Sequence, residues 1–150
     1  MTQRPELVAA VACAVPLLDM LRYQHFLIAR FWINEFGSAE DPEQFQWLRA
    51  YSPYHNTRSG TRYPAVLFTT AEGDSRVDPG HARKMTALLQ WLQRDDPEAT
   101  TLLRVDRDAG HGIGKPLDKQ VDDAAEQLAF FASRLGLRAA DRVGTVAAGR

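Results

Sequence analysis

Cysteine is nearly absent from this 150-residue sequence, and long apolar runs are missing. The single cysteine, Cys13, excludes an internal disulfide and lies in an apolar run, so we expect a small buried hydrophobe in a reducing compartment, the cytoplasm. No apolar run approaches the ~18 residues that a membrane span requires. Residues 1–5 also lack the basic-then-apolar layout of a signal peptide, and we expect no targeting segment.

The chain also lacks a strong net charge, internal repeats and low-complexity blocks. Its formal charge is −1, which removes any global argument for binding nucleic acid or an anionic membrane surface. The hydrophobic share of 45% and the charged share of 25% are ordinary for a globular protein. A chain of this length is enough for one domain with a sizeable core.

Apolar runs that predict strands alternate with segments of helical periodicity. The strand-like runs are 7–15, 64–68 and 101–105, and the helical patterns are 42–50, 79–94 and 118–135, with a looser helix-like stretch at 19–36. This alternation predicts an α/β fold in which three parallel strands are joined by helical crossovers. Three strands make a poor complete sheet of this type, so we expect the chain to be the second half of one.

Polar loops follow the second and third predicted strands. Asp74 and Arg76 lie in the polar turn 71–76, which follows the run 64–68 and two threonines, and His111, flanked by Gly110 and Gly112, follows the run 101–105. In open α/β sheets, ligands bind beyond the carboxyl ends of the strands. An acid and a histidine in this order are the second and third members of a Ser…Asp…His array of the α/β-hydrolase type. The alternative is that Asp74 caps a turn and His111 is a solvated loop residue.

Other functional motifs are excluded because residues that they require are absent. The stretch 110–115 lacks the first glycine and the Ser/Thr of a phosphate loop, and the loop that begins at Asp106 has Leu117 where a calcium loop needs glutamate. His25, His55 and His81 have no metal-ligand spacing, and we expect them at the surface or as capping residues. No serine has the G-x-S-x-G setting of a nucleophile; the candidates considered are Ser38, Ser52, Ser59, Ser75 and Ser133.

Several segments together resemble the carboxyl-terminal part of the prolyl oligopeptidase family of serine peptidases. They are MTQRPEL (1–7), VPLLDMLRY (15–23), FWINEFGS (31–38), AYSPYHN (50–56), YPAVLFTTAEGDSRV (63–77) and AGHGIGKP (109–116). They occur in family order and span the chain to about residue 135. The resemblance implies an α/β-hydrolase catalytic domain that cleaves short peptides after proline, with no metal or organic cofactor.

The resemblance also implies roles for individual residues. Asp74 and His111 match the catalytic aspartate and histidine, and Arg76 matches an arginine that binds a substrate backbone carbonyl. Trp32 matches a tryptophan that stacks on the substrate proline ring. The same pocket includes positions matched by Leu17, Phe36 and Val77; close relatives commonly carry valine and tyrosine at the first two of these.

The family's nucleophilic serine lies on a G-G-S-N-G-G turn shortly before the segment matched by MTQRPEL, and this sequence begins after it. We therefore expect residues 1–137 to be a partial peptidase domain, 138–150 to be a flexible tail, and the missing amino-terminal half of the domain to be a partner. The chain alone is expected to be inactive and poorly soluble, because removing a triad member leaves only residual catalysis. The alternatives are an acyl-aminoacyl or dipeptidyl peptidase of the same family, and a non-catalytic fragment that acts through a partner chain.

Overall fold

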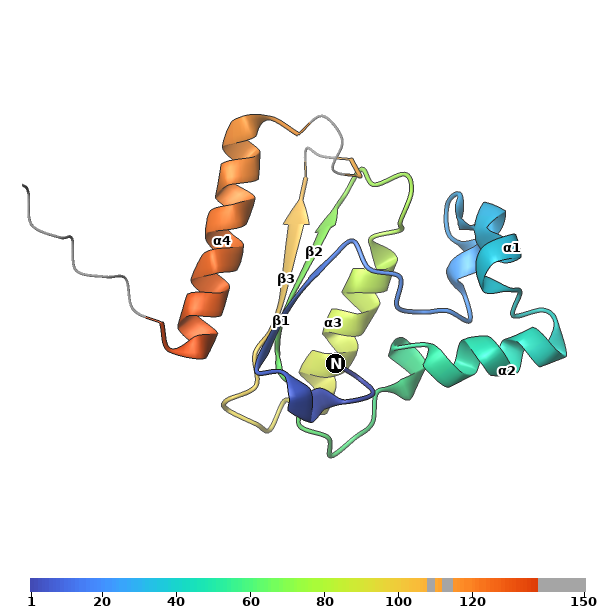
Figure 1. The fold of residues 1–150 in the computed structure, drawn as a ribbon, viewed down its shortest axis with the longest axis horizontal. Coiled ribbons are helices and arrows are strands. Elements are labelled where there is room, and N and C mark those ends of the chain that lie inside the picture. Colours follow the sequence, from blue (N-terminus) through green and yellow to red (C-terminus); the bar gives the residue numbers. More distant parts are fainter. Residues whose placement is uncertain (108–109, 112–114, 138–150) are drawn as a thin grey trace, which may run out of the picture.

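The computed structural model of the chain describes residues 1–107, 110–111 and 115–137. Its elements, in chain order, are the 3₁₀ turn η1 (Pro5–Leu7), β1 (Ala10–Ala14), the turns η2 (Tyr23–His25) and η3 (Ala29–Trp32), α1 (Ile33–Phe36), α2 (Pro42–Tyr51), the turn η4 (Tyr54–Asn56), β2 (Ala65–Ala71), α3 (Gly80–Leu92), β3 (Thr101–Asp106) and α4 (Leu117–Leu135). Figure 1 shows the strands between α3 and α4, with α1 and α2 in a lobe beside the sheet. The predicted tail 138–150 and part of the predicted loop around His111 lie outside the described residues.

The strands form a parallel sheet in the order β1-β2-β3, so the predicted α/β class with three parallel strands is confirmed. The central strand β2 pairs Phe68 with Cys13 on one side and with Leu103 on the other. Within the described part of the chain, β1 pairs only with β2. The first strand is also shorter than the predicted run 7–15, because Pro5–Leu7 forms a 3₁₀ turn before it.

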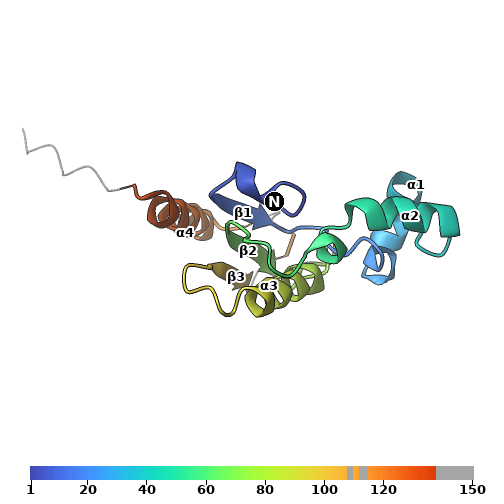
Figure 2. The same ribbon diagram turned by 90° about the horizontal axis from the view of Figure 1, so that it is seen from below.

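Alternation along the strands sends side chains to two different layers. Val66 and Phe68 of β2 point to α3, where they form the main core with Met85 and Leu89. The opposite face meets α4, through ion pairs such as the one between Arg104 of β3 and Asp123. Figure 2 shows the sheet edge-on with the two helices on either side. The result is a three-layer arrangement with one buried and one thinly covered sheet face.

Short polar side chains and a glycine lie at the helix ends. The Asp41 carboxylate accepts the backbone N–H groups of Glu43 and Gln44 at the start of α2. Asp78 accepts the N–H of Gly80 at 2.7 Å where α3 begins. Gly136 ends α4 with φ +67°, a conformation that glycine adopts without strain. Among the described residues, no helix is long and apolar enough to cross a membrane.

The stretch 19–36 differs from the helix-like interpretation of its sequence. It contains only single turns and the four-residue α1, because Leu27 adopts φ +50° and interrupts any continuous helix. Its apolar side chains instead build a second core cluster of Met20, Tyr23, Ala29 and Leu48. The segment 15–37, which we call the wall segment, continues from the carboxyl end of β1.

Candidate active site

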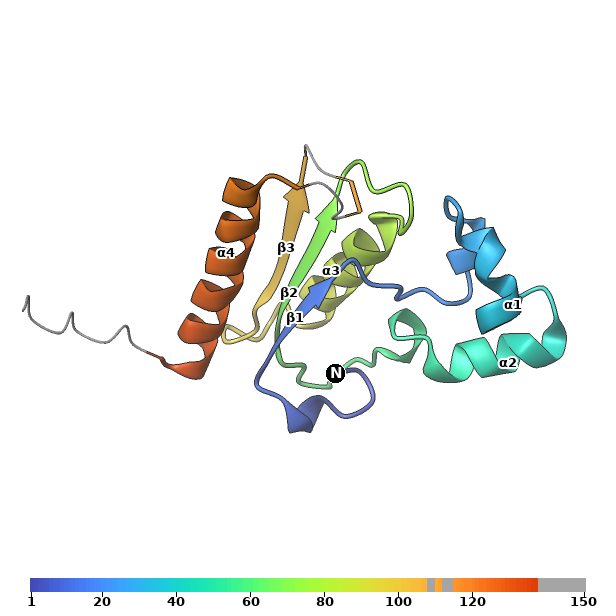
Figure 3. The same cartoon turned by 45° about the horizontal axis from the view of Figure 1, so that its top comes forward.

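Asp74 and His111 meet beyond the carboxyl ends of β2 and β3. The Asp74 Oδ2 atom lies 2.8 Å from His111 Nδ1, and Asp74 Oδ1 accepts the backbone N–H groups of Arg76 at 2.8 Å and Val77 at 2.9 Å. Asp74 is buried, whereas the His111 side chain is 26% exposed. Figure 3 shows the two strands ending on the side of the sheet from which these loops leave. The turn after β2 therefore fixes the carboxylate, and the carboxylate orients the imidazole.

The hydrogen bonds around Asp74 decide its charge. Burial alone would raise the pKa of Asp74, but the hydrogen bonds from His111 and from the backbone of Val77 and Arg76 outweigh it and hold that pKa below its ordinary value. Asp74 is then ionised at neutral pH and accepts a hydrogen bond from the Nδ1–H group of His111. A neutral imidazole held in this tautomer keeps Nε2 unprotonated, which leaves Nε2 as a proton acceptor.

A cleft of about 490 Å³ opens in front of His111. Its lining consists of Val15, Leu17, Trp32, Glu35, Phe36, Arg76, Val77 and His111. The structure thus brings together six of the seven residues singled out from the sequence, and Asp74 lies behind the histidine, hydrogen-bonded to it. Apolar walls, with the charged side chains of Arg76 and Glu35 in the same lining, suit a small apolar ring or chain attached to a polar backbone.

Two of the lining residues, Val15 and Glu35, were not predicted from the sequence as site residues. Val15 has φ +41°, an uncommon and strained conformation for a β-branched residue, and its N–H donates to the Thr69 carbonyl at 2.8 Å. This turn directs the chain from β1 into the wall segment. No sequence signal marks it, because valine is among the residues least suited to a positive φ. Glu35 lies in the first turn of α1, next to Phe36 in the cleft lining.

Behind His111, on the side of α4, lies a second and more polar hollow of about 550 Å³. Lys115 bridges the end of β3 to α4 there, with ion pairs to Asp106 at 2.5 Å and to Asp123. Burial would lower the pKa of Lys115, but the two carboxylates raise it above its ordinary value. Lys115 is therefore charged, and it anchors the chain that follows the histidine loop. Within the described residues, no three His, Cys, Asp or Glu side chains group closely enough to hold a metal ion.

The interpretation of His81 as a surface or capping residue is wrong. Its side chain is 1% exposed and lies between α3 and the beginning of the wall segment, where Nδ1 accepts the backbone N–H of Asp19 at 3.1 Å. His55 is partly buried and lies 2.9 Å from the buried Ser52 hydroxyl. These contacts join positions up to 62 residues apart, and no local sequence pattern predicts them.

Comparison with known proteins assigns this fold to a peptidase family whose catalytic domain is of the α/β-hydrolase type. The model of the prolyl oligopeptidase family matches residues 1–138, and the chain belongs to that family. Among curated relatives, it is 38% identical to a prolyl endopeptidase from Elizabethkingia miricola and 35% identical to one from Dictyostelium discoideum. These matches cover 92% and 91% of this chain, but 19% and 18% of the relatives.

Solved structures give the same result. A prolyl endopeptidase superposes with a TM-score of 0.87 at 48% identity, over 92% of this chain and 20% of that protein. A post-proline cleaving enzyme from Rickettsia typhi superposes with a TM-score of 0.80 at 36% identity, over 93% of this chain and 20% of its own. The chain therefore spans about a fifth of the length of the proteins that it matches.

Proposed function

We propose that this chain is the carboxyl-terminal part of the catalytic domain of a serine peptidase that cleaves short peptides on the carboxyl side of proline. The observation that carries the proposal is the 2.8 Å pair of Asp74 and His111 at the mouth of an apolar cleft that includes Trp32. The relatives called prolyl endopeptidase support the substrate class. The free thiol of Cys13 is consistent with a cytoplasmic location.

In the proposed reaction, His111 moves the protons and Asp74 stabilises the charge. Nε2 of His111 takes the proton from an attacking serine hydroxyl and later delivers it to the leaving amine. The ionised Asp74 keeps Nδ1 protonated and stabilises the imidazolium that forms between the two steps. The serine itself is proposed to come from the upstream part of the domain.

Solved variants of a prolyl oligopeptidase B from Galerina marginata support the proposal that this chain supplies the aspartate and the histidine and that the upstream part supplies the serine. In separate variants of that enzyme a serine, an aspartate or a histidine is replaced by alanine, and the aspartate and histidine are 37 positions apart, as are Asp74 and His111. The replaced serine precedes the aspartate by more positions than lie between Met1 and Asp74. Equal spacing in this chain's protein would put the serine ahead of Met1.

The cleft lining supports selection of proline. Trp32 offers a flat apolar ring for stacking on the pyrrolidine, and Leu17, Phe36 and Val77 supply the remaining apolar wall. Arg76 is proposed to bind a backbone carbonyl of the substrate. The main alternatives within the family are removal of acyl-amino acids or of dipeptides, which the apolar lining alone does not distinguish.

Exposed apolar surface supports an upstream partner for this half-domain. Within the described residues β1 has one strand neighbour, so its outer edge has backbone groups open to another strand. The apolar residues of α4 that lie at helical spacing on its outer face are exposed: Leu117, Val121, Leu128 and Leu135. A further part of the same domain would cover both.

The test uses what we call the complete peptidase. This is the reading frame that contains the chain or, if that frame begins at Met1, the chain joined to the upstream part of the Elizabethkingia miricola prolyl endopeptidase. Blocked dipeptides ending in Pro or Ala, an acyl-Ala and a free-amino dipeptide, each linked to a fluorogenic amine, are compared by kcat/KM. We expect the blocked proline substrate to be preferred by at least about tenfold. Preference for the acyl-Ala or the free-amino dipeptide would overturn the proposal.

A further inference from the structure

The wall segment supplies Leu17, Trp32 and Phe36 to the cleft, yet it contains little regular structure. Its longest helix is the four-residue α1, and the other elements are single 3₁₀ turns. Short turns do not hold a position by their own hydrogen bonds, because isolated helices below about 12 residues are marginal. Contacts with the rest of the molecule must therefore fix where the cleft residues stand.

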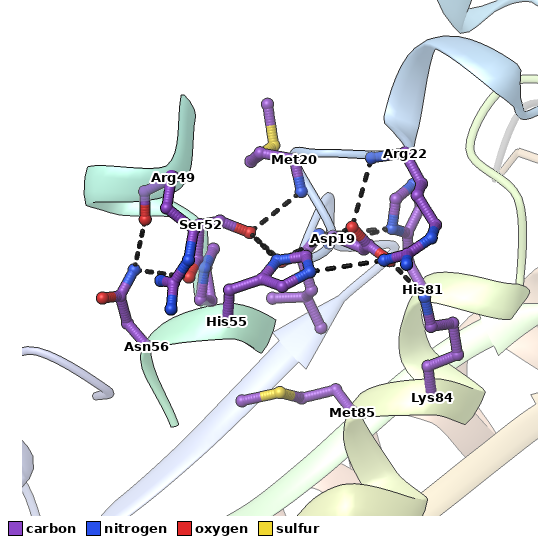
Figure 4. A network of polar contacts seen from close by, with 12 residues as sticks. Asp19, Met20, Arg22, Arg49, Ser52, His55, Asn56, His81, Lys84 and Met85 are labelled. Atoms are coloured by element: carbon purple, nitrogen blue, oxygen red, sulfur yellow. Dashed lines mark hydrogen bonds and ion pairs between the residues drawn. The ribbon is translucent and has the colours of Figure 1, made fainter. Parts of the chain in front are cut away.

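Side chains from two other elements hold the backbone directly after Leu17. Nδ1 of His81, from α3, accepts the N–H of Asp19 at 3.1 Å and that of Leu18 at 3.5 Å. The Ser52 hydroxyl accepts the N–H of Met20 at 3.0 Å and donates to the Leu18 carbonyl at 3.3 Å. Three consecutive backbone N–H groups thus donate to two side-chain acceptors. Figure 4 shows Ser52 and His81 on either side of Asp19 and Met20.

The carboxylate of Asp19 strengthens this arrangement. It is 1% exposed and forms an ion pair with Lys84 of α3, and Arg22 lies 3.5 Å from it. His55 Nδ1 lies 3.7 Å from the same carboxylate. Burial would raise the pKa of Asp19, but the hydrogen bond and charge of Lys84, with His55 and Arg22, hold it below its ordinary value. A charged, paired carboxylate therefore ties the wall segment to α3.

Packing connects the backbone at 18–20 to the cleft residues. Met20 belongs to the core cluster with Tyr23, Ala29 and Leu48. Three cleft residues pack against that cluster, namely Leu17, Trp32 and Phe36, and the Phe36 ring meets the edge of Tyr23 at 5.7 Å. Tyr23 also donates to the Gly37 carbonyl at 2.6 Å, at the other end of the wall segment.

We propose that His81 and Ser52 are positioning residues for substrate selection, which hold the wall segment so that Leu17, Trp32 and Phe36 form a pocket of proline size. Neither residue lines the cleft, so they act through the backbone at 18–20 and the cluster around Met20. The inference rests on the proposed function, since the selected group is the residue before the cleaved bond. It adds residues that the catalytic proposal does not use.

Two substitutions of His81 distinguish the effect of losing the hydrogen-bond acceptor from the effect of losing the imidazole ring. His81→Phe leaves two buried N–H groups without their acceptor, whereas His81→Asn keeps an acceptor near the position of Nδ1. Ser52→Ala removes the second acceptor. The matched control is His25→Phe, because His25 lies in the same wall segment and is exposed.

The readout is kcat and KM of the complete peptidase for the blocked proline and alanine dipeptides. For His81→Phe and Ser52→Ala we expect KM for the proline substrate to rise about tenfold, since a lost acceptor costs about one factor of ten. We expect kcat to change less than about threefold and the preference for proline over alanine to fall. His81→Asn should restore most of the preference, and His25→Phe should leave it unchanged.

Three results would overturn the inference. They are an unchanged proline-to-alanine ratio in both His81→Phe and Ser52→Ala, a fall in kcat alone, and no difference between His81→Asn and His81→Phe. If His81→Phe does not fold, Ser52→Ala decides by the same ratio, because its loss of the acceptor for Met20 is independent of His81. A wild-type complete peptidase without preference for proline would instead count against the proposed function, so the two failures are distinguishable.

Discussion

Asp74 is held between two opposing influences, and their balance sets the chemistry of the site. Burial favours the neutral acid, while three hydrogen bonds favour the carboxylate and win. A carboxylate with a lowered pKa in the folded state stabilises the protein above the unfolded-state value, and this contribution is lost as the pH falls through the folded-state pKa. The same charge is proposed to keep His111 in its working tautomer.

Asp74→Asn should therefore impair catalysis far more than binding. An amide in place of the carboxylate no longer enforces the Nδ1–H tautomer and does not stabilise an imidazolium, so we expect kcat of the complete peptidase to fall about 10⁴-fold. KM for the proline substrate should change less than about threefold. The exposed neighbour Glu72, changed to Gln, is the control and should retain activity. A loss below about tenfold in Asp74→Asn would contradict the role of Asp74.

His81 gives the chain a sensitivity to acid. Burial lowers the pKa of His81 from its ordinary value of 6.5, so the folded state binds the proton less readily than the unfolded state. Stability is then complete above about pH 6.5 and falls as the pH decreases toward the folded-state pKa. The limiting slope for one proton is about 1.4 kcal/mol per pH unit.

Urea unfolding of the chain at pH 7.5, 6.5 and 5.5 measures this slope. We expect the free energy of unfolding of the wild type to decrease between the last two points. His81→Asn cannot take up the proton and should have a flatter profile over the same range. Equal slopes in both proteins would show that His81 does not titrate as its burial requires.

Among the elements, helix α4 has apolar residues on two surfaces, one buried and one exposed. Phe130 is buried, whereas Leu128 is 68% exposed. Phe130 is therefore expected to contribute to the stability of this chain, and Leu128 to be available for contact with a partner. Substitutions at these two positions of one helix can test stability and association separately.

Phe130→Ala should lower the free energy of unfolding of the chain by about 3–5 kcal/mol, because it leaves a cavity beneath α4. Leu128→Lys should change it by less than about 0.5 kcal/mol and should raise the solubility of the isolated chain. Chemical denaturation and the saturating concentration measure the two effects. Comparable destabilisation by both substitutions would mean that the outer face of α4 is already packed within this chain.

The elements also show which features the sequence makes predictable. The three strands follow from apolar runs, and the ends of α2 and α4 follow from Asp41 and Gly136, since these signals are local. The wall segment 15–37 was not predictable in this way. Its path depends on positive φ angles at Val15 and Leu27 and on contacts with residues far along the chain.

For the site, the sequence predicts Asp74 and His111 as candidates because polar residues follow two neighbouring parallel strands. The cleft residues Leu17, Trp32, Phe36 and Val77 came from the family resemblance, since no periodicity distinguishes them from core residues. The positioning contacts of Asp19, Ser52 and His81 were not predicted, because they join residues that lie far apart in the sequence. The roles of all these residues remain predictions.

For the whole molecule, the central claim is that this chain supplies half of an active site. It spans about a fifth of the length of its relatives and has an acid and a histidine in contact. Within the described residues it also has a strand edge without a neighbouring strand and an exposed helix face. Each of these features is expected of one part of a divided catalytic domain.

The most direct measurement is hydrolysis of the blocked proline dipeptide by three samples: the chain alone, the upstream part alone, and the two expressed together. We predict no turnover above background by either part alone and turnover by the pair, which Asp74→Asn in this chain reduces. Hydrolysis by the chain alone, or an inactive pair in which both parts are folded and associated, would contradict the account.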